Sequence, residues 1–240
     1  MPSINYPKSD TKRIEFVRHC LGTAKKDIEM SLLYLPQELI DQLETTQTRF
    51  ESSYQKLDSK LSDRQKQVRE KNEAMTLLEQ CVRDFFEVFK RRTYRLKHPS
   101  EVLRFYGVTL SGDLPDISND TSLLIAAGNI VNGDAKAVVA GYSTMTNPSA
   151  SEVSSLLVAA KKEFNDVAPA DREYDAVQKE LDALREPTDE LIREVYDHLK
   201  FAFRKESASN ARRLLRTYGF QYSYLKGEPK EEEQVVPENN

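Results

Sequence analysis

The chain has 240 residues and a formal net charge of −4 at pH 7, with 31% charged and 39% hydrophobic residues. This length suffices for one or two domains with a buried core, and the modest net charge argues neither for nor against nucleic-acid binding. No apolar run reaches the length of a membrane-spanning helix, and the N-terminal residues lack the charged and apolar regions of a signal peptide. We therefore expect a soluble, cytoplasmic protein without a transmembrane segment.

The chain nearly repeats itself. Short motifs recur at a separation that stays between 108 and 112 residues, as the following pairs show: Asp10 and Asp120, Gly22 and Gly133, Pro36 and Pro148, Asp63 and Asp171, Arg104 and Arg216. Such a steady offset is the signature of a tandem duplication. The sequence therefore predicts a first helical repeat over residues 1–108, a second over 109–225, and an acidic disordered tail over 226–240.

Each predicted repeat opens with a helix start signal. Ser9-Asp10 and Asn119-Asp120 are suited to capping a helix, because their side-chain oxygens accept hydrogen bonds from its free N–H groups. Apolar residues at spacings of three and four then predict an amphipathic helix over 11–33. In the second repeat, 123–142 is interrupted by Asn132-Gly133, which predicts two short helices.

The next predicted helix opens at Pro36 in the first repeat and at Pro148 in the second, with Asn147 as cap. Its apolar residues keep a near-heptad spacing, which is typical of a coiled coil. Residues 56–71, however, contain almost no apolar side chain and no helix breaker. They are compatible both with a hairpin tip and with the middle of one long helix.

The second repeat favours the hairpin. Pro169 lies at the corresponding point, and a proline inside a helix removes a hydrogen bond and clashes with the preceding turn. We therefore expect return helices over 63–97 and 171–205. A last short helix, over 100–106 or 208–218, ends at a glycine suited to the left-handed position after a helix.

These elements define a fold class. No β-strand pattern is present. The sequence predicts an all-α protein, a tandem duplication of a helical-hairpin unit of about 110 residues each. The two units would pack as an elongated antiparallel helix bundle with pseudo-twofold symmetry.

Two basic clusters are the candidate binding sites. If each repeat is a hairpin, equivalent helix ends lie at the same end of the bundle, so the clusters converge into a site for an anion or a partner protein. The alternative is that these cations only offset the partial negative charge of helix C-termini. The candidate residues are Lys90, Arg91, Arg92, Arg95, Lys97, Arg104, Arg212, Arg213 and Arg216.

No pattern points to catalysis, a cofactor or a metal. Phosphate-binding, dinucleotide-binding and nucleophile motifs do not occur. Glu15 and His19, like Glu194 and His198, are four residues apart, whereas a di-metal carboxylate bundle uses a spacing of three. The two cysteines align with apolar residues of the other repeat and are interpreted as buried free thiols.

The function expected from these observations is that of a non-enzymatic interaction or scaffold protein whose partner is a protein, a second copy of the chain being one candidate. The alternative is a module that binds a polyanion, meaning nucleic acid, acidic lipid or an acidic protein, at the shared basic helix ends. A third hypothesis is a small-molecule binder or an enzyme with a pocket between the repeats.

Overall fold

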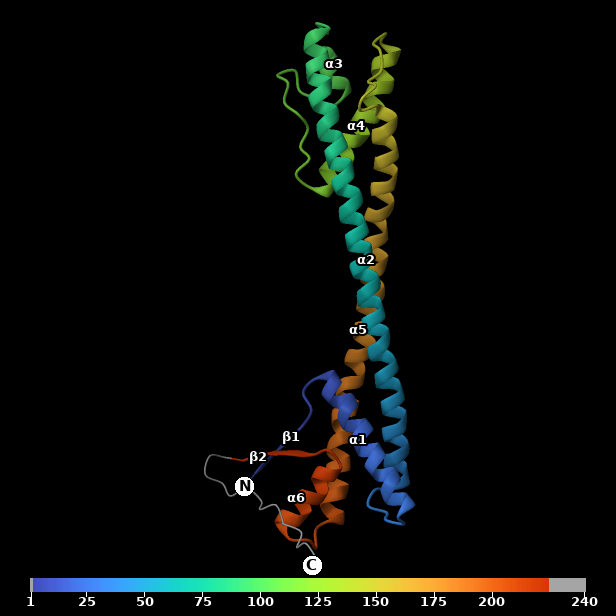
Figure 1. Ribbon diagram of the computed structural model, residues 1–240, viewed down its shortest axis with the longest axis vertical. Coiled ribbons are helices and arrows are strands. Elements are labelled where there is room, and N and C mark those ends of the chain that lie inside the picture. Colours follow the sequence, from blue (N-terminus) through green and yellow to red (C-terminus); the bar gives the residue numbers. More distant parts are fainter. Residues whose placement is uncertain (1, 225–240) are drawn as a thin grey trace, which may run out of the picture. The chain divides into compact units, whose positions relative to one another are not determined.

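A computed structural model describes residues 2–224 (Figure 1), and the predicted tail at 226–240 lies outside them. Helices dominate, which confirms the all-α prediction. The elements in chain order are β1 (Ser3–Asn5), α1 (Asp10–Glu29), α2 (Gln37–Arg95), α3 (Glu101–Phe105), α4 (Asp120–Val139), α5 (Ala150–Ala202), α6 (Ala208–Thr217) and β2 (Gln221–Ser223). None of the helices within residues 2–224 is long and apolar enough to cross a membrane.

The chain divides into two compact units. Unit 1 consists of residues 1–59 and 175–240, and unit 2 of the continuous stretch 60–174. The helices α2 and α5 contribute to both units. The predicted repeat boundary, between residues 108 and 109, lies inside unit 2, so each unit takes elements from both predicted repeats. The repeats themselves stay a prediction.

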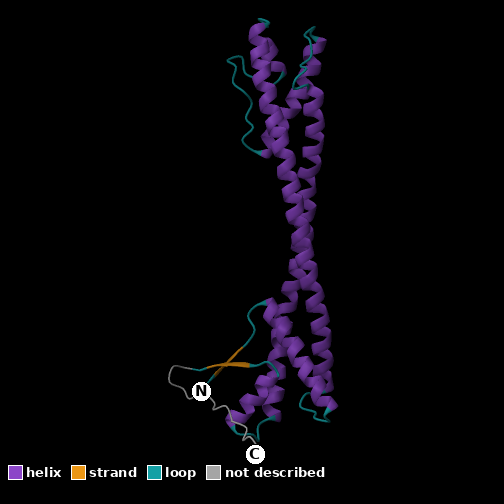
Figure 2. Ribbon diagram, viewed as in Figure 1, coloured by secondary structure: helices purple, strands orange, loops and turns teal. Residues whose placement is uncertain are grey.

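Unit 1 joins the two ends of the chain. It contains α1, the first part of α2, the last part of α5, and α6 (Figure 2). Its core is a cluster of buried apolar side chains that includes Phe16, Leu43, Ile192, Leu199 and Phe220. Such side chains supply most of the free energy of folding, because their burial removes apolar surface from water.

Ion pairs also connect distant segments of unit 1. The guanidinium of Arg13 donates two hydrogen bonds of 2.8 Å to Asp189. Arg185 donates bonds of 2.8 and 2.6 Å to Asp10. The start of α1 is thereby tied to α5 by paired, charge-assisted hydrogen bonds.

A small sheet in unit 1 corrects the expectation that strands are absent. β1 and β2 pair antiparallel, with Ile4 opposite Tyr222. Both of these side chains pack against the core of unit 1. These strands could not be predicted, because three residues are too few to display an alternating pattern.

Unit 2 contains the last part of α2, α3, α4 and the first part of α5. Its core is a second cluster of buried apolar side chains, among them Leu78, Phe85, Phe86, Ile130 and Val153. Each unit therefore has a hydrophobic core of its own.

The predicted hairpins are wrong. α2 runs without interruption through residues 56–71, and α5 runs through Pro169. Within unit 2, Lys60 of α2 contacts Glu173 of α5 at 2.7 Å, and Arg64 contacts Asp171 at 2.5 Å. The polar stretch is thus paired through charges with a neighbouring helix. Pro169 is exposed, so water can hydrate the carbonyl left without a hydrogen-bond donor.

Two finer expectations are also wrong. α4 is one helix, and Gly133 does not break it. A Cβ atom at Gly133 would lie 2.3 Å from the carbonyl oxygen of Phe105, so glycine is needed there for close packing. α5 begins at Ala150, two residues after Pro148, and the hydroxyl of Ser149 accepts a hydrogen bond from the N–H of Glu152.

The predicted helix ends are confirmed at two positions. α3 and α6 are each followed by a tyrosine and then by a glycine with positive φ, 75° at Gly107 and 97° at Gly219. This backbone conformation favours glycine, which has no Cβ. The predicted buried free thiols are confirmed as well, since Cys20 and Cys81 are buried and unpaired.

Candidate functional site

One end of unit 2 concentrates positive charge. We call residues 88–100 and 135–151 of unit 2 the basic end. It contains six Lys and Arg residues, namely Lys90, Arg91, Arg92, Arg95, Lys97 and Lys136, and no Asp or Glu. Both segments begin and end directly beside a carboxylate, at Glu87, Glu101, Asp134 and Glu152, and unit 2 as a whole carries as many acidic as basic residues, so the positive charge is a local feature of these two segments.

The fold brings the two segments of the basic end together. The guanidinium of Arg92, near the end of α2, donates hydrogen bonds to the carbonyl oxygens of Ser143 at 2.7 Å and Thr144 at 2.6 Å, in the loop after α4. The rings of His98 and Tyr142 lie 5.0 Å apart, edge to face. Arg92 therefore has a structural role, and the turn after α2 lies against the turn after α4.

A buried carboxylate lies beneath the basic end. Asp134 on α4 accepts hydrogen bonds from the hydroxyl of Tyr106 at 2.9 Å and from the N–H of Met145 at 3.2 Å. Burial, together with this hydrogen bond, raises the pKa of Tyr106. Asp134 thus links the segment after α3 to the loop after α4. The sequence does not single out Asp134, because only its buried position separates it from the many exposed carboxylates of the chain.

The cations of the basic end face solvent. Lys90, Arg91, Arg95 and Lys97 are all exposed. Within residues 2–224, Lys90, Arg95 and Lys97 form no side-chain hydrogen bond or ion pair, whereas Arg91 contacts Glu87 at 3.4 Å with both side chains largely in water. A pair so exposed contributes little to stability and is easily exchanged for another anion.

Carboxylates border the basic end without neutralising it. The pKa of Asp113 is lowered, first by hydrogen bonds from Ser111 and Thr109 and least by the charge of Lys90. That carboxylate therefore stays ionised near Lys90.

Arg104, another predicted site residue, is exposed on α3 outside the basic end.

Apolar side chains are exposed among these cations. Tyr94 is 87% exposed on α2, with Lys90 and Arg91 as its neighbours on the same helix face and Arg95 next to it in the sequence. Val139 is 90% exposed at the end of α4, and Leu96 and Val138 are about half exposed. The basic end therefore offers both positive charge and uncovered apolar surface.

The second predicted cluster lies in unit 1. Arg212, Arg213 and Arg216 belong to α6, and Arg213 donates a 2.7 Å hydrogen bond to Asn210. The predicted convergence depended on a hairpin in each repeat, and those hairpins are absent. The nine predicted site residues are thus divided between the two units, six in unit 2 and three in unit 1.

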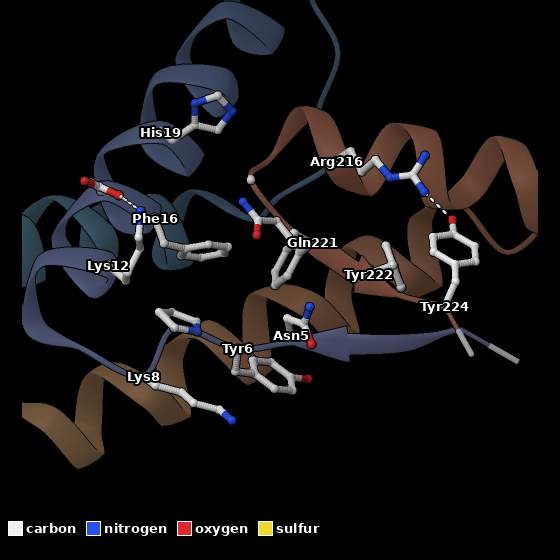
Figure 3. Close-up of a pocket in the computed structure, with 14 residues that line it drawn as sticks. Asn5, Tyr6, Lys8, Lys12, Phe16, His19, Arg216, Gln221, Tyr222 and Tyr224 are labelled. Atoms are coloured by element: carbon white, nitrogen blue, oxygen red, sulfur yellow. Dashed lines mark hydrogen bonds and ion pairs between the residues drawn. The ribbon is translucent and has the colours of Figure 1, made fainter. Parts of the chain in front are cut away.

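A pocket of about 980 Å³ in unit 1 includes one predicted site residue, Arg216 (Figure 3). It is lined by the lead into α1, by α1 itself, and by residues around β2. Arg216 bonds to the hydroxyl of Tyr224 and lies over the rings of Tyr222 and Tyr224, at 5.8 and 6.0 Å. Lys12 contributes a second positive charge and is bonded to Glu15 at 2.7 Å. The pocket is aromatic and of mixed charge, suited to a small planar ligand.

Nucleophiles and metal ligands are not assembled in the described residues. Burial raises the pKa of the Cys20 thiol to about 12, so the thiol carries its proton at neutral pH. His19, at the pocket, shares a 3.0 Å hydrogen bond with the carbonyl oxygen of Thr217. No group of three His, Cys, Asp or Glu residues suited to a metal ion occurs within residues 2–224.

Comparison of the chain with protein-family models, with curated proteins and with solved structures found no match.

Proposed function

We propose that this chain is a non-catalytic helical binding protein that holds a polyanion at the basic end of unit 2. The observation that carries the proposal is the segregation of six cations, with no carboxylate, into two segments that Arg92 and the contact between His98 and Tyr142 bring together. Clustered cations bind phosphate-bearing or otherwise acidic partners, because the counterions held by such a partner are released on binding.

The test is a binding measurement on the full chain with heparin, a single-stranded DNA oligonucleotide and acidic lipid vesicles, each at low and high salt. We expect at least one of these polyanions to bind, with an affinity that falls steeply as salt increases. Replacing Lys90, Arg91 and Arg95 by Gln should weaken binding at low salt roughly tenfold or more and reduce the salt dependence. Arg92 is kept, because its loss would disturb the loop after α4.

A matched control removes the same charge elsewhere in unit 2. Lys161, Lys162 and Arg172 are exposed on α5, outside the basic end. Their replacement by Gln should leave affinity within about twofold of the parent, since distant exposed charges are screened by salt. If all three polyanions fail to bind at low salt, or if the two triple variants lose affinity equally, the proposal is wrong.

A scaffold role is the second candidate, and an exposed face of α2 favours it. A shallow groove along this helix includes Val68, Thr76 and Leu77, and Leu77 is largely uncovered. Of the eight residues that line this groove only Val68 and Leu77 are apolar, and such side chains on a helix can contact a partner helix, including one from a second copy of the chain. Replacement of Leu77 by Gln should then abolish self-association in sedimentation measurements, whereas a chain that is monomeric at all concentrations would exclude this role for the groove.

We propose further that the chain arose by tandem duplication. Residues 10–107 and 120–219 show the same order of elements, namely a helix of 20 residues, a long helix, a short helix, a tyrosine and a positive-φ glycine. The pseudo-twofold arrangement of the two copies remains a prediction.

Buried free thiols support a reducing, cytoplasmic location, which stays part of the proposal.

A further inference from the structure

We infer that the polyanion held by the basic end is an acidic lipid surface; this inference rests on the function proposed above. A membrane with anionic headgroups offers negative charge and hydrocarbon at the same boundary. The basic end presents the matching pair, since it carries both exposed cations and exposed apolar side chains. Nucleic acid would bind the same cations equally well, so the exposed apolar side chains are what favours a lipid surface over nucleic acid.

The exposed apolar side chains of the basic end are suited to contact with lipid hydrocarbon. Leu96, Val138 and Val139 are aliphatic and have no side-chain donor or acceptor with which to read a base. Single-stranded nucleic acid is bound mainly by stacking on several aromatic rings, and within the basic end only Tyr94 offers a highly exposed one. A tyrosine beside aliphatic side chains is instead typical of the membrane interface, where the ring is buried and the hydroxyl stays hydrated.

The geometry supports shallow attachment. Val138 and Val139 end α4, Tyr94 lies in the last turn of α2, and Leu96 follows it. Both helix ends lie at the top of unit 2 in Figure 1. Arg92 of α2 is bonded to the loop after α4, and the ring of His98 after α2 lies against Tyr142 in that loop, so the apolar groups and the cations are held on one support. Since no described helix can cross a membrane, contact is limited to the headgroup region and the first part of the acyl chains.

Long cationic side chains fit the same placement. The methylene groups of Lys90, Arg91 and Arg95 can lie along the apolar boundary while their charges reach the headgroups. Carboxylates directly flank the two segments of the basic end, at Glu87, Glu101, Asp134 and Glu152, and Glu87 is paired with Arg91. Attachment therefore exchanges one exposed ion pair for contacts with acidic headgroups.

The experiment compares three probes with the full chain: vesicles of phosphatidylcholine, vesicles in which about a third of the lipid is phosphatidylserine, and heparin. We expect sedimentation with the acidic vesicles only, weakened by salt. The double substitution of Val138 and Val139 by Ser should lower affinity for acidic vesicles roughly tenfold, because it removes apolar surface. It should leave heparin binding within about twofold, because it removes no charge.

The matched control is Ile125→Ser. Ile125 is 60% exposed on the same helix, α4, but near its first turn and outside the basic end. This variant should bind acidic vesicles as the parent does. A second measurement uses the absence of tryptophan from the chain. The fluorescence of Val139→Trp should shift to the blue with acidic vesicles, and that of Ile125→Trp should not.

The outcomes separate the inference from the function on which it rests. Binding to heparin or DNA without binding to acidic vesicles would overturn the lipid assignment and leave the proposed function standing. Equal vesicle affinity of the parent and the double Ser variant, with no fluorescence shift at position 139, would also overturn it. A chain that binds none of these probes at low salt refutes both.

Discussion

Units 1 and 2 share an internal tyrosine–aspartate hydrogen bond but differ in the surface beside it. In each, a tyrosine that follows a short helix bonds to an aspartate on a 20-residue helix, Tyr218 to Asp27 in unit 1 and Tyr106 to Asp134 in unit 2. In unit 1 the neighbouring surface is a pocket with charges of both signs, whereas in unit 2 it is the carboxylate-free basic end. The internal supports are alike and the outer surfaces differ, so these surfaces are where separate functions are to be sought.

The largest expected difference between the units concerns two glycines. Gly133→Ala in unit 2 should destabilise the protein by about 3 kcal/mol, because the new Cβ meets the backbone of Phe105. Gly22→Ala in unit 1 meets nothing within 4 Å and should stabilise helix α1 by about 0.5–1 kcal/mol. Urea unfolding of both variants tests this contrast. Equal effects would mean that the close contact between α3 and α4 does not constrain unit 2.

The tyrosines should give a smaller difference. Tyr106→Phe removes one of two donors to the buried Asp134 and should cost about 2 kcal/mol, whereas Tyr218→Phe should cost about 1 kcal/mol, because Asp27 is only half-buried and can bind water. Both variants keep the aromatic ring, so packing is preserved. Equal losses in thermal unfolding would contradict the importance of burial at Asp134.

The same tyrosines predict a dependence on alkaline pH. The pKa of Tyr106 is raised in the folded state, chiefly by burial, so its neutral form stabilises the fold. This contribution is complete below the unfolded pKa of about 10 and is lost as the pH rises toward the folded pKa. The Phe variant lacks this dependence. Between pH 9 and about 11, the stability difference between parent and Tyr106→Phe should therefore shrink, as measured by urea unfolding.

Ion pairs should give the smallest difference. Asp10 in unit 1 is largely buried and contacts both Arg13 and Arg185, so Asp10→Asn should cost about 1 kcal/mol. Asp171 in unit 2 contacts Arg64 with both side chains more than 40% exposed, so Asp171→Asn should change stability by less than about 0.5 kcal/mol. Added salt should reduce the second effect more than the first. The reverse order would show that exposure does not govern the strength of these pairs.

Helix positions and caps could be predicted from the sequence because they depend on local signals. The apolar spacing in α1, the caps Ser9 and Asn119, and the glycines after α3 and α6 all act within a few residues. The continuity of α2 and α5 could not be predicted from the sequence, because it depends on ion-pair partners more than a hundred residues away in the chain. Lys60 and Arg64 look like solvated residues until Glu173 and Asp171 are placed beside them.

The candidate site was predictable in part. The density of cations at 90–97 is visible in the sequence. That residues 135–151 belong to the same basic end is visible only in the structure, through the contact that Arg92 makes with the loop after α4. A single lysine, Lys136, gives this second segment no charge pattern of its own. The exposure of Val138 and Val139 was equally hidden, since apolar residues in a helix ordinarily predict a buried face.

The pairing of Ser3 with Ser223 has a consequence for the order in which the protein is made. Residues 60–174 form one continuous stretch, so unit 2 can assemble as soon as that stretch has left the ribosome. β1 and α1, which precede this stretch, cannot form their contacts with Arg185, Asp189 and β2 until those later residues have been made. Residues 3–29 are thus synthesised before unit 2 but form their contacts after it, which is the inverse of the usual order of co-translational folding.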